Sequence, residues 1–375
     1  MAIAATADIS REAITSTLDA ALRIADFTEE DPFSGLADKE NMATEVLDLD
    51  LYHPWELSNE EAILIAKQCE EAARSHDPRI TNSEGANFST AASFYVYGNT
   101  LGFVGSYPTT HHSLSVAVIA KEKDSMERDH DYTIARDVKD LESGLKVGRE
   151  AAIRTVRRLN ARKLKTCQAP VIFAAEIAGG LLGHFLAAIS GPQLYRKSSF
   201  LLDHLGKQIF PKFIHLEENP HIPKGLGSVP FDQEGVAIRK RDIISEGVLQ
   251  GYVLSSYSAR KLGLKTTGNA GGVHNLFVSH SSDDLNQLLK KMHKGLLVTE
   301  LMGQGINLVT GDYSRGAFGF WVENGEIQYP VHEVTIAGNL KEMFLNLSAI
   351  GNDIERRSSI FTGSILIDQM TIAGS

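Results

Sequence analysis

Two segments in the N-terminal part of the chain have apolar residues at helical spacing. The first covers residues 10–26, with Ser10 as its predicted N-cap. The second follows Ser58, which is predicted to form a capping box with Glu61, each side chain bonding the other residue's backbone amide. Cys69 occupies an apolar position of this second helix, so we expect a buried structural thiol there.

Farther along, the apolar positions change from helical spacing to alternation. Phe94–Tyr97 and Ser113–Ile119 are predicted strands, joined through Gly and Pro residues. Arg149–Lys165 is then predicted as a basic helix. Because it carries no interleaved aromatic residues for stacking on bases, we interpret it as a solvated face or a contact for an acidic partner.

A shift in composition divides the chain into an N-terminal and middle α/β region, residues 1–165, and a β-rich C-terminal domain, residues 166–375. The second region opens with Ala169–Ala174, which has the pattern of a buried strand, and Glu176–Ser190, a nearly apolar helix. A long segment rich in Gly and Pro extends to Gly235, and loops of that length are usually functional or bind a partner.

One hairpin is strongly indicated in the C-terminal third. Phe318, Phe320 and Val322 alternate with other residues up to Asn324-Gly325, and the alternation resumes directly afterwards. Asn-Gly readily takes the positive φ angles of a two-residue turn, so two antiparallel strands are predicted on either side of it.

Charge and cysteine content narrow the functional classes. The 375 residues include 37 Lys and Arg against 47 Asp and Glu, a net charge of −10, which disfavours direct nucleic-acid binding. No apolar run approaches the ~20 residues of a membrane span, and the N-terminus has no signal-peptide pattern. Two distant cysteines form no disulfide framework or metal motif. We therefore expect a cytoplasmic protein without membrane contact.

The common motifs of phosphate-binding, dinucleotide-binding, serine-hydrolase and His-Glu-x-x-His enzymes do not occur in the sequence. His332-Glu333 is the one His-Glu pair, and no second histidine follows within a helical turn. We interpret this pair as exposed at the end of a strand.

Three other features leave alternatives open. His111 and His112 are adjacent, so on a strand they point to opposite faces and cannot share a metal. Glu176 and His184 lie two turns apart on one side of a predicted helix and form either a shared ligand site or a satisfied polar pair at a helix–sheet junction. The segment 268–272, with three glycines, either brings backbone amides close to a ligand or forms a flexible turn.

Several longer motifs resemble the PmbA/TldE branch of the TldD/PmbA family, historically called modulators of DNA gyrase. The most specific are Leu297–Gly305, Gly311–Gly316 and Phe320–Ile327. Further matching segments are Tyr195–Asp203, Pro230–Asp232 with Glu234 and Gly235, Ser256–Gly263, Thr335–Leu340 and Ile350–Glu355. The resemblance extends from about Ile14 to the C-terminus. It implies an α+β fold, with an N-terminal α/β domain and a β-rich C-terminal domain.

Members of this family usually begin with a further helix and several strands before the point that matches Met1. We therefore expect an N-terminal domain that is short of strands, through a late start or a truncation. Such a domain would leave a sheet edge exposed.

The resemblance also implies a heteromeric zinc peptidase. The TldD-type subunit carries His-Glu-x-x-x-His on a helix and a later cysteine as zinc ligands, and the PmbA/TldE-type subunit lacks them. On this chain the two histidines fall on Ala175 and Gly180, the glutamate on Glu176, and the cysteine near Ser358. Methyl and hydrogen side chains cannot bind zinc, and a neutral hydroxyl is a poor ligand. Glu176 keeps the residue type of the general base but has no metal-bound water to activate.

The expected function is therefore that of a catalytically silent subunit. We expect no cofactor in this chain, zinc in a TldD-type partner, and peptides or unfolded protein segments as substrates. Whether a homodimer forms without that partner stays open. Candidate substrate or partner contacts are Gly271, Gly272, Arg315 and the loop 206–235.

Two other functions remain as alternatives. The chain is itself a metallopeptidase with other ligands, such as Glu176, His184 and a distant histidine. Or it is a binding protein for gyrase or DNA, for which an indirect effect through peptide cleavage agrees better with the negative charge than direct DNA binding does.

Overall fold

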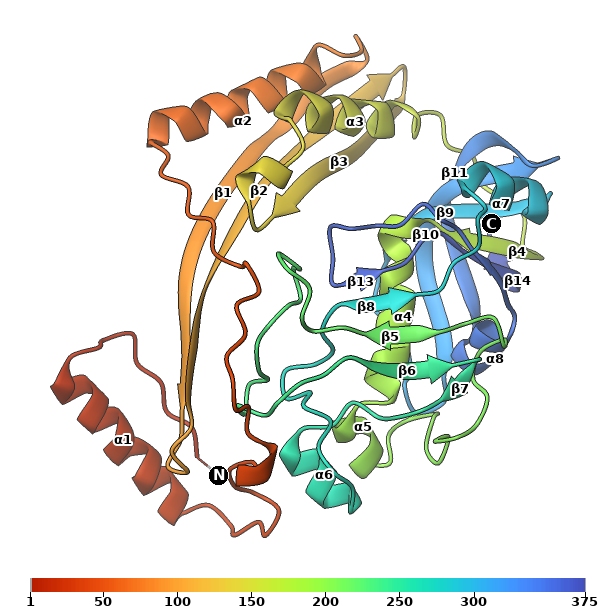
Figure 1. Cartoon of the computed structure of the whole chain (residues 1–375). Helices are drawn as coiled ribbons and strands as arrows, with labels where there is room; N and C mark the ends of the chain where they lie inside the picture. The colour runs from red at the N-terminus through yellow and green to blue at the C-terminus, as the bar shows by residue number, and fades with distance from the viewer. Residues whose placement is uncertain (1, 375) are drawn as a thin grey trace.

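The computed structural model describes residues 2–374, which fold into helices and strands of three β-sheets (Figure 1). The α-helices are α1 Arg11–Asp26, α2 Asn59–Arg74, α3 Gly144–Val156, α4 Ala175–Ala188, α5 Gly191–Tyr195, α6 Ser256–Leu262, α7 Leu285–Met292 and α8 Leu340–Leu345. The strands are β1 Ile80–Gly98, β2 Val104–Glu122, β3 Ser125–Ala135, β4 Cys167–Phe173, β5 Leu216–Glu218, β6 Arg241–Ser245, β7 Val248–Leu249, β8 Leu276–Val278, β9 Gly295–Met302, β10 Asp312–Glu323, β11 Glu326–Asn339, β12 Leu347–Ile350, β13 Ile360–Phe361 and β14 Ile365–Ala373.

The first sheet is antiparallel, in the order β1-β2-β3, and its two long strands form a curved arm (Figure 1). Helices α2 and α3 pack against each other and against one end of this sheet. Cys69 of α2 and Ala151 of α3 are fully buried in the resulting core, together with Val116 and Val118 of β2. The free half of the arm has no such cover, and most side chains of β1 there are exposed to solvent.

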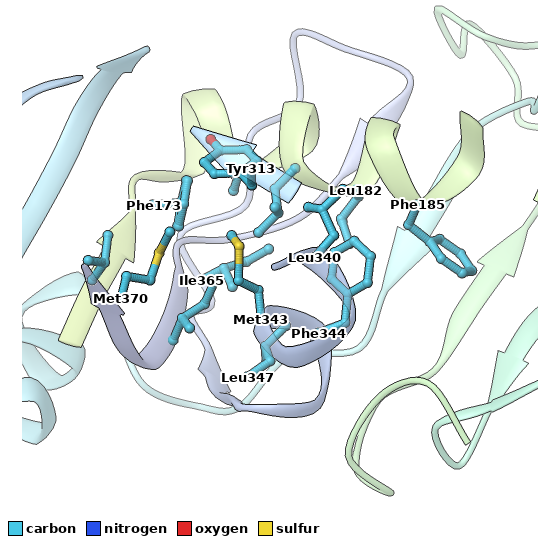
Figure 2. Packing of buried hydrophobic residues seen from close by; sticks show 14 of the residues in the cluster. Phe173, Leu182, Phe185, Tyr313, Leu340, Met343, Phe344, Leu347, Ile365 and Met370 are labelled. Atoms are coloured by element: carbon cyan, nitrogen blue, oxygen red, sulfur yellow. The ribbon is translucent and has the colours of Figure 1, made fainter. Parts of the chain in front are cut away.

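The other two sheets enclose α4. One has the strand order β11-β10-β9-β4-β14-β12 and closes on itself through a β11–β14 pairing. The other has the order β13-β8-β5-β6-β7. Leu182 and Phe185 of α4 are buried in a cluster that draws apolar residues from both sheets and from α8, and Figure 2 shows them beside Leu340 and Phe344. Because α4 is covered on several sides, its sequence is apolar nearly all round.

Helix α1 lies beside the far end of the arm (Figure 1). None of its residues is buried, and Leu18 and Leu22 leave large apolar surfaces exposed, as does Phe27 directly after the helix. Within residues 2–374, no helix combines the length and the apolar character needed to cross a membrane.

Several local predictions are confirmed. Ser10 caps α1 by accepting a hydrogen bond from the Ala13 amide, and Ser58 forms the expected capping box with Glu61 at the start of α2. Asn324 and Gly325 turn β10 into β11 with φ angles of 55° and 74°. These features were predictable because each depends on contacts within a few residues of chain.

The predicted strand limits in the arm are wrong. Phe94–Tyr97 and Ser113–Ile119 are only parts of two 19-residue strands. The residues expected as a Gly- and Pro-rich connection include Pro108, which instead pairs with Phe94 inside the arm. Proline is tolerated because β3 pairs with β2 only from His112 onward, so β2 is an edge strand at Pro108. The exposed half of the arm needs no apolar face, so apart from Phe94–Tyr97 the sequence of β1 there lacks the pattern of a half-buried strand.

Two further predictions need correction. The basic helix expected over Arg149–Lys165 ends at Val156. The pair His332-Glu333 lies inside β11 rather than at a strand end. It falls at an irregularity of the strand, where Glu333 has a φ of 52°. The Glu333 carboxylate forms an ion pair with Lys163 at 2.7 Å. This irregularity falls opposite the register shift between Ala317 and Gly319 of β10, a long-range feature that the local pattern does not encode.

Candidate functional site

The first turn of α4 lies at the junction between the arm and the C-terminal sheets. The N-cap residue, Ala174, has no side-chain oxygen to accept hydrogen bonds from the first helical amides. Ser364, just before β14, replaces that cap: its hydroxyl accepts from the Ala175 amide at 3.0 Å and donates to Asp353 at 2.6 Å. The start of α4 is thereby fixed by a residue nearly two hundred positions away.

Two cavities adjoin this turn. The larger has a volume of about 860 Å³ and the smaller about 340 Å³. Asp131 of β3, Arg154 of α3 and Glu176 of α4 line both, so the cavities share a wall. The smaller cavity also reaches Gly180 of α4 and Arg315 of β10.

The shared wall is held together by ion pairs. Arg154 donates a hydrogen bond to Glu176 and lies 3.7 Å from Asp129, while Arg158 lies 3.3 Å from Asp129 and 2.5 Å from Glu300. The side chains of Arg154 and Arg158 are only 15% and 11% exposed. Burial opposes the charge of Arg154, but Glu176 and Asp129 outweigh it and raise the pKa of Arg154 above its ordinary value. The carboxylate of Glu176 is therefore engaged by a permanent cation.

This network corrects part of the interpretation of the basic segment. Arg154 and Arg158 turn inward toward acidic residues of β3 and β9, whereas the other basic residues of the segment are exposed, namely Arg149, Arg157, Arg162, Lys163 and Lys165. The guanidinium of Arg158 also lies 3.9 Å above the Phe318 ring of β10, and Arg157 lies 5.1 Å above Phe320. The segment thus joins the arm to the C-terminal sheets.

A third arginine makes a similar bridge on the larger cavity. Arg357, in the loop before β13, donates to Asp131 at 2.8 Å and to the Tyr132 carbonyl at 2.9 Å, both on β3. It also bonds Glu355 at 2.7 Å. Burial acts to raise the pKa of Glu355, but the hydrogen bonds from Arg357 outweigh it and lower that pKa below its usual range.

Two buried polar side chains, Tyr313 and His184, lie near Arg315 but are not part of the lining of the smaller cavity. Tyr313 is 2% exposed, and burial raises the pKa of its hydroxyl to about 12. The His184 ring lies 6.1 Å from the Tyr313 ring, and burial together with Arg315 lowers the pKa of His184. Both groups are therefore neutral near pH 7.

Comparison with known proteins identifies the family. Residues 166–374 match the PmbA/TldA metallopeptidase C-terminal domain, and residues 52–159 match the central domain of that family. The chain belongs to the PmbA/TldD family. The resemblance inferred from the sequence motifs is thereby confirmed.

Similar full-length proteins agree with this assignment. Metalloprotease PmbA of Escherichia coli O157:H7 is 55% identical over 371 residues, which cover 99% of this chain and 82% of that protein. A Metalloprotease PmbA homolog of Haemophilus influenzae is 51% identical over 373 residues, with 99% and 83% covered.

Solved structures of PmbA/TldD-like proteins have the same fold. A Bacteroides thetaiotaomicron protein described as a modulator of DNA gyrase superposes with a TM-score of 0.92 at 28% identity, covering 99% of this chain and 85% of the other. TldE from Thermococcus kodakarensis superposes with a TM-score of 0.80 at 21% identity, covering 100% and 87%, a likeness of fold alone. The expected mixed α and β architecture is confirmed.

The positions at which the resemblance implies zinc ligands in a TldD-type subunit lie on α4 and in the loop before β13. Ala175 is the first residue of α4, and Glu176 follows it in the cavity wall. Gly180 borders the smaller cavity, and a Cβ atom placed there would meet nothing within 4 Å. Ser358 bonds within its own loop, accepting from the Ile360 amide at 3.0 Å and donating to the Ile360 carbonyl at 2.9 Å. None of the side chains at the three ligand positions, Ala175, Gly180 and Ser358, offers an imidazole, thiolate or carboxylate, so these positions do not fit a zinc ion.

Across the part of the chain that the structure describes, no three His, Cys, Asp or Glu side chains come together in a group that could hold a metal ion. Glu176 and His184 do share one side of α4, but Glu176 bonds Arg154 while His184 packs against Tyr313. The two therefore belong to different groups of side chains. His112 is buried and His111 is exposed, which confirms that they face opposite sides of β2.

The other predicted contact residues do not form one site. Gly271 and Gly272 have φ angles of 105° and 112° and lie next to the long loop, where Gln233 bonds the Ala270 carbonyl. Arg315 lies apart from them, on β10 beside the smaller cavity. In this Gly-rich turn, Asp232 accepts the Ala270 amide at 3.0 Å, and burial raises the pKa of Asp232 to about 6.

Among the carboxylates of the cavity wall, Glu176 was a predicted site residue, whereas Asp129, Asp131 and Glu300 were not. Asp129 and Asp131 lie two residues apart on β3 and point to the same side, as Glu127 does. That alternation of acidic residues, with basic residues in the next segment, was the available signal. The pairing of Asp131 with Arg357, and of Arg158 with both Asp129 and Glu300, depends on contacts across the fold and could not be predicted from neighbouring residues.

Proposed function

We propose that this chain is the non-catalytic subunit of a heteromeric zinc peptidase, in which a TldD-type partner holds the metal and cleaves peptides. The supporting observation is the side-chain chemistry at the first turns of α4. Ala175 and Gly180 stand where that partner type has histidines, and neither can supply a lone pair to zinc.

The environment of Glu176 supports the same proposal. A general base must reach the proton of a reacting water. Here the carboxylate instead bonds Arg154, which is also held by Asp129. We infer that Glu176 is a structural member of the wall, and that the cavities beside it add binding surface to the partner's peptide chamber.

The proposal predicts an asymmetric dependence of peptide cleavage on the two subunits. Addition of this chain to a TldD-type partner is expected to raise cleavage of an unfolded peptide, while the chain alone cleaves none. Glu176→Gln is expected to leave the activity of the mixed complex within about twofold, because the amide oxygen still accepts a bond from Arg154. The measurement is peptide turnover with each subunit alone and with both together.

The alternative is that this chain cleaves peptides without a partner. The relatives in E. coli and H. influenzae carry the name metalloprotease, so this alternative deserves a test. Cleavage by the isolated chain that disappears in Glu176→Gln would support that alternative and contradict the proposal. A partner whose activity is the same with and without this chain would also contradict it.

A further inference from the structure

Strand β1 forms an open edge of the first sheet. It pairs with β2 on one side, and between residues 86 and 98 no other part of residues 2–374 makes a backbone hydrogen bond to it. Figure 1 shows β1 on the outer side of the arm, with α1 beside the far end. In an antiparallel strand every second residue directs its amide and its carbonyl to the same edge, so about twelve backbone groups along this stretch have no protein partner.

This edge lacks the features that usually keep an edge strand from pairing with another chain. Charged residues, prolines, bulges or a covering segment are the usual protection. Residues 86–98 contain no charged residue and no proline, and their pairing with β2 is regular. The two register shifts of β1 lie before this stretch, between Ile80 and Gly85, as does Glu84, the single charged residue of the strand. A regular, uncharged edge of this length is a ready template for another strand.

Apolar side chains of the same stretch are open to solvent. Phe94 is 67% exposed and Val96 is 57% exposed. Tyr95, between them, points to the opposite face of the arm, where its ring lies 6.2 Å from that of Phe231. Phe94 and Val96 therefore share a face that a second chain can cover while the arm keeps its contact with Phe231.

A second copy of the chain matches this edge in an antiparallel register. A twofold axis makes such pairing self-complementary, because each residue of one copy faces the same partner position in the other. With Ala92 of both copies at the axis, Ala86 faces Gly98 and every residue of 86–98 has a partner. The two Glu84 residues then lie outside the paired stretch at its opposite ends, so like charges do not meet.

The side chains and the backbone both favour this register. Phe94 of one copy lies opposite Thr90 of the other, and Val96 lies opposite Phe88, whose ring packs 5.4 Å from Trp55. Cross-strand pairs of aromatic and β-branched residues stabilise sheets. The paired stretch supplies about twelve backbone hydrogen bonds, within the range of about ten that a specific protein interface carries.

We propose that this chain forms a homodimer through β1, in which residues 86–98 of two copies pair antiparallel around Ala92. The two three-stranded sheets then join into one continuous sheet. Each copy offers one such uncharged edge, so the assembly closes as a dimer and does not extend into a fibre. This inference goes beyond the proposed function, because it rests on the edge of the arm and needs no TldD-type partner.

The first test is the mass of the purified full chain in solution, measured by sedimentation equilibrium over a wide range of concentration. Twice the mass of one chain is expected. Ala92→Lys places two like charges directly opposite each other at the axis and is expected to weaken dimerisation about fivefold or more. Thr81→Lys is the matched control, since Thr81 is an exposed residue of the same strand outside the paired stretch. It should leave the dimer unchanged.

A cross-link tests the register without adding charge. Opposite residues of antiparallel strands have Cα atoms about 4.5–5.5 Å apart, within reach of a disulfide. Ala92→Cys is therefore expected to form a covalent dimer on oxidation, whereas Thr81→Cys is not. The unchanged chain, with Cys69 and Cys167, gives the background.

Three results would overturn the proposal. They are a monomer at every concentration, a dimer that Ala92→Lys leaves intact, and equal cross-linking of Ala92→Cys and Thr81→Cys. A chain that is monomeric alone but loses binding to a TldD-type partner in Ala92→Lys would assign the edge to that partner instead of a second copy. That outcome would contradict the homodimer and leave the proposed function standing, so the two proposals can fail separately.

Discussion

Arg154→Met is expected to lower the free energy of unfolding by about 2–4 kcal/mol, because it leaves the partly buried carboxylate of Glu176 without its cation and leaves Asp129 with Arg158 alone. Methionine keeps most of the apolar stem, so the loss reports the charge rather than the packing. The Glu176 side chain is 27% exposed, which moves the expected loss below that of a fully enclosed pair.

Chemical denaturation of the full chain measures this loss. Arg239→Met is the matched control at an exposed arginine and should change stability by less than about 0.5 kcal/mol. The double variant Arg154→Met with Glu176→Gln should recover part of the loss, because it also removes one stranded charge. A loss below about 1 kcal/mol for the single variant, the level of an exposed ion pair, would show that the wall is not a cooperative network.

Gly148→Ala should destabilise the chain by about 1–3 kcal/mol through overpacking of α2 against α3. A Cβ atom at Gly148 would lie 2.4 Å from the Cys69 carbonyl oxygen and 2.9 Å from the Ala72 Cβ. Backbone cannot yield as a flexible side chain can, so the two helices would have to separate.

Gly180→Ala is the matched control, since Gly180 is also a helical glycine but its added Cβ atom meets nothing within 4 Å. Alanine has the higher helix propensity, so this variant should gain up to about 1 kcal/mol. Urea denaturation of both variants tests the pair of predictions. Equal stabilities for Gly148→Ala and Gly180→Ala would contradict the close approach of α2 and α3.

Local signals in the sequence were enough for elements that depend on neighbouring residues. The caps at Ser10 and Ser58, the buried Cys69 and the Asn324-Gly325 turn all agree with the structure. The length of the arm was missed because most of β1 is exposed and so carries no alternation of apolar residues.

The candidate site was only half predictable. The replaced positions Ala175 and Gly180 come from comparison with a motif, so they were available before the fold was known. The hydrogen bond from Arg154 to Glu176 could not be predicted from the sequence, because it depends on the packing of α3 against the first turn of α4.

The most direct test of the proposed role is the zinc content of the purified chain, measured by elemental analysis after dialysis without a chelator. The replacement of both histidine positions by Ala175 and Gly180 predicts a value near zero, with zinc recovered instead in a TldD-type partner. A value of about one zinc ion per chain, the stoichiometry of a single catalytic site, would mean that other side chains supply the ligands. That result would contradict the assignment of this chain as the non-catalytic subunit.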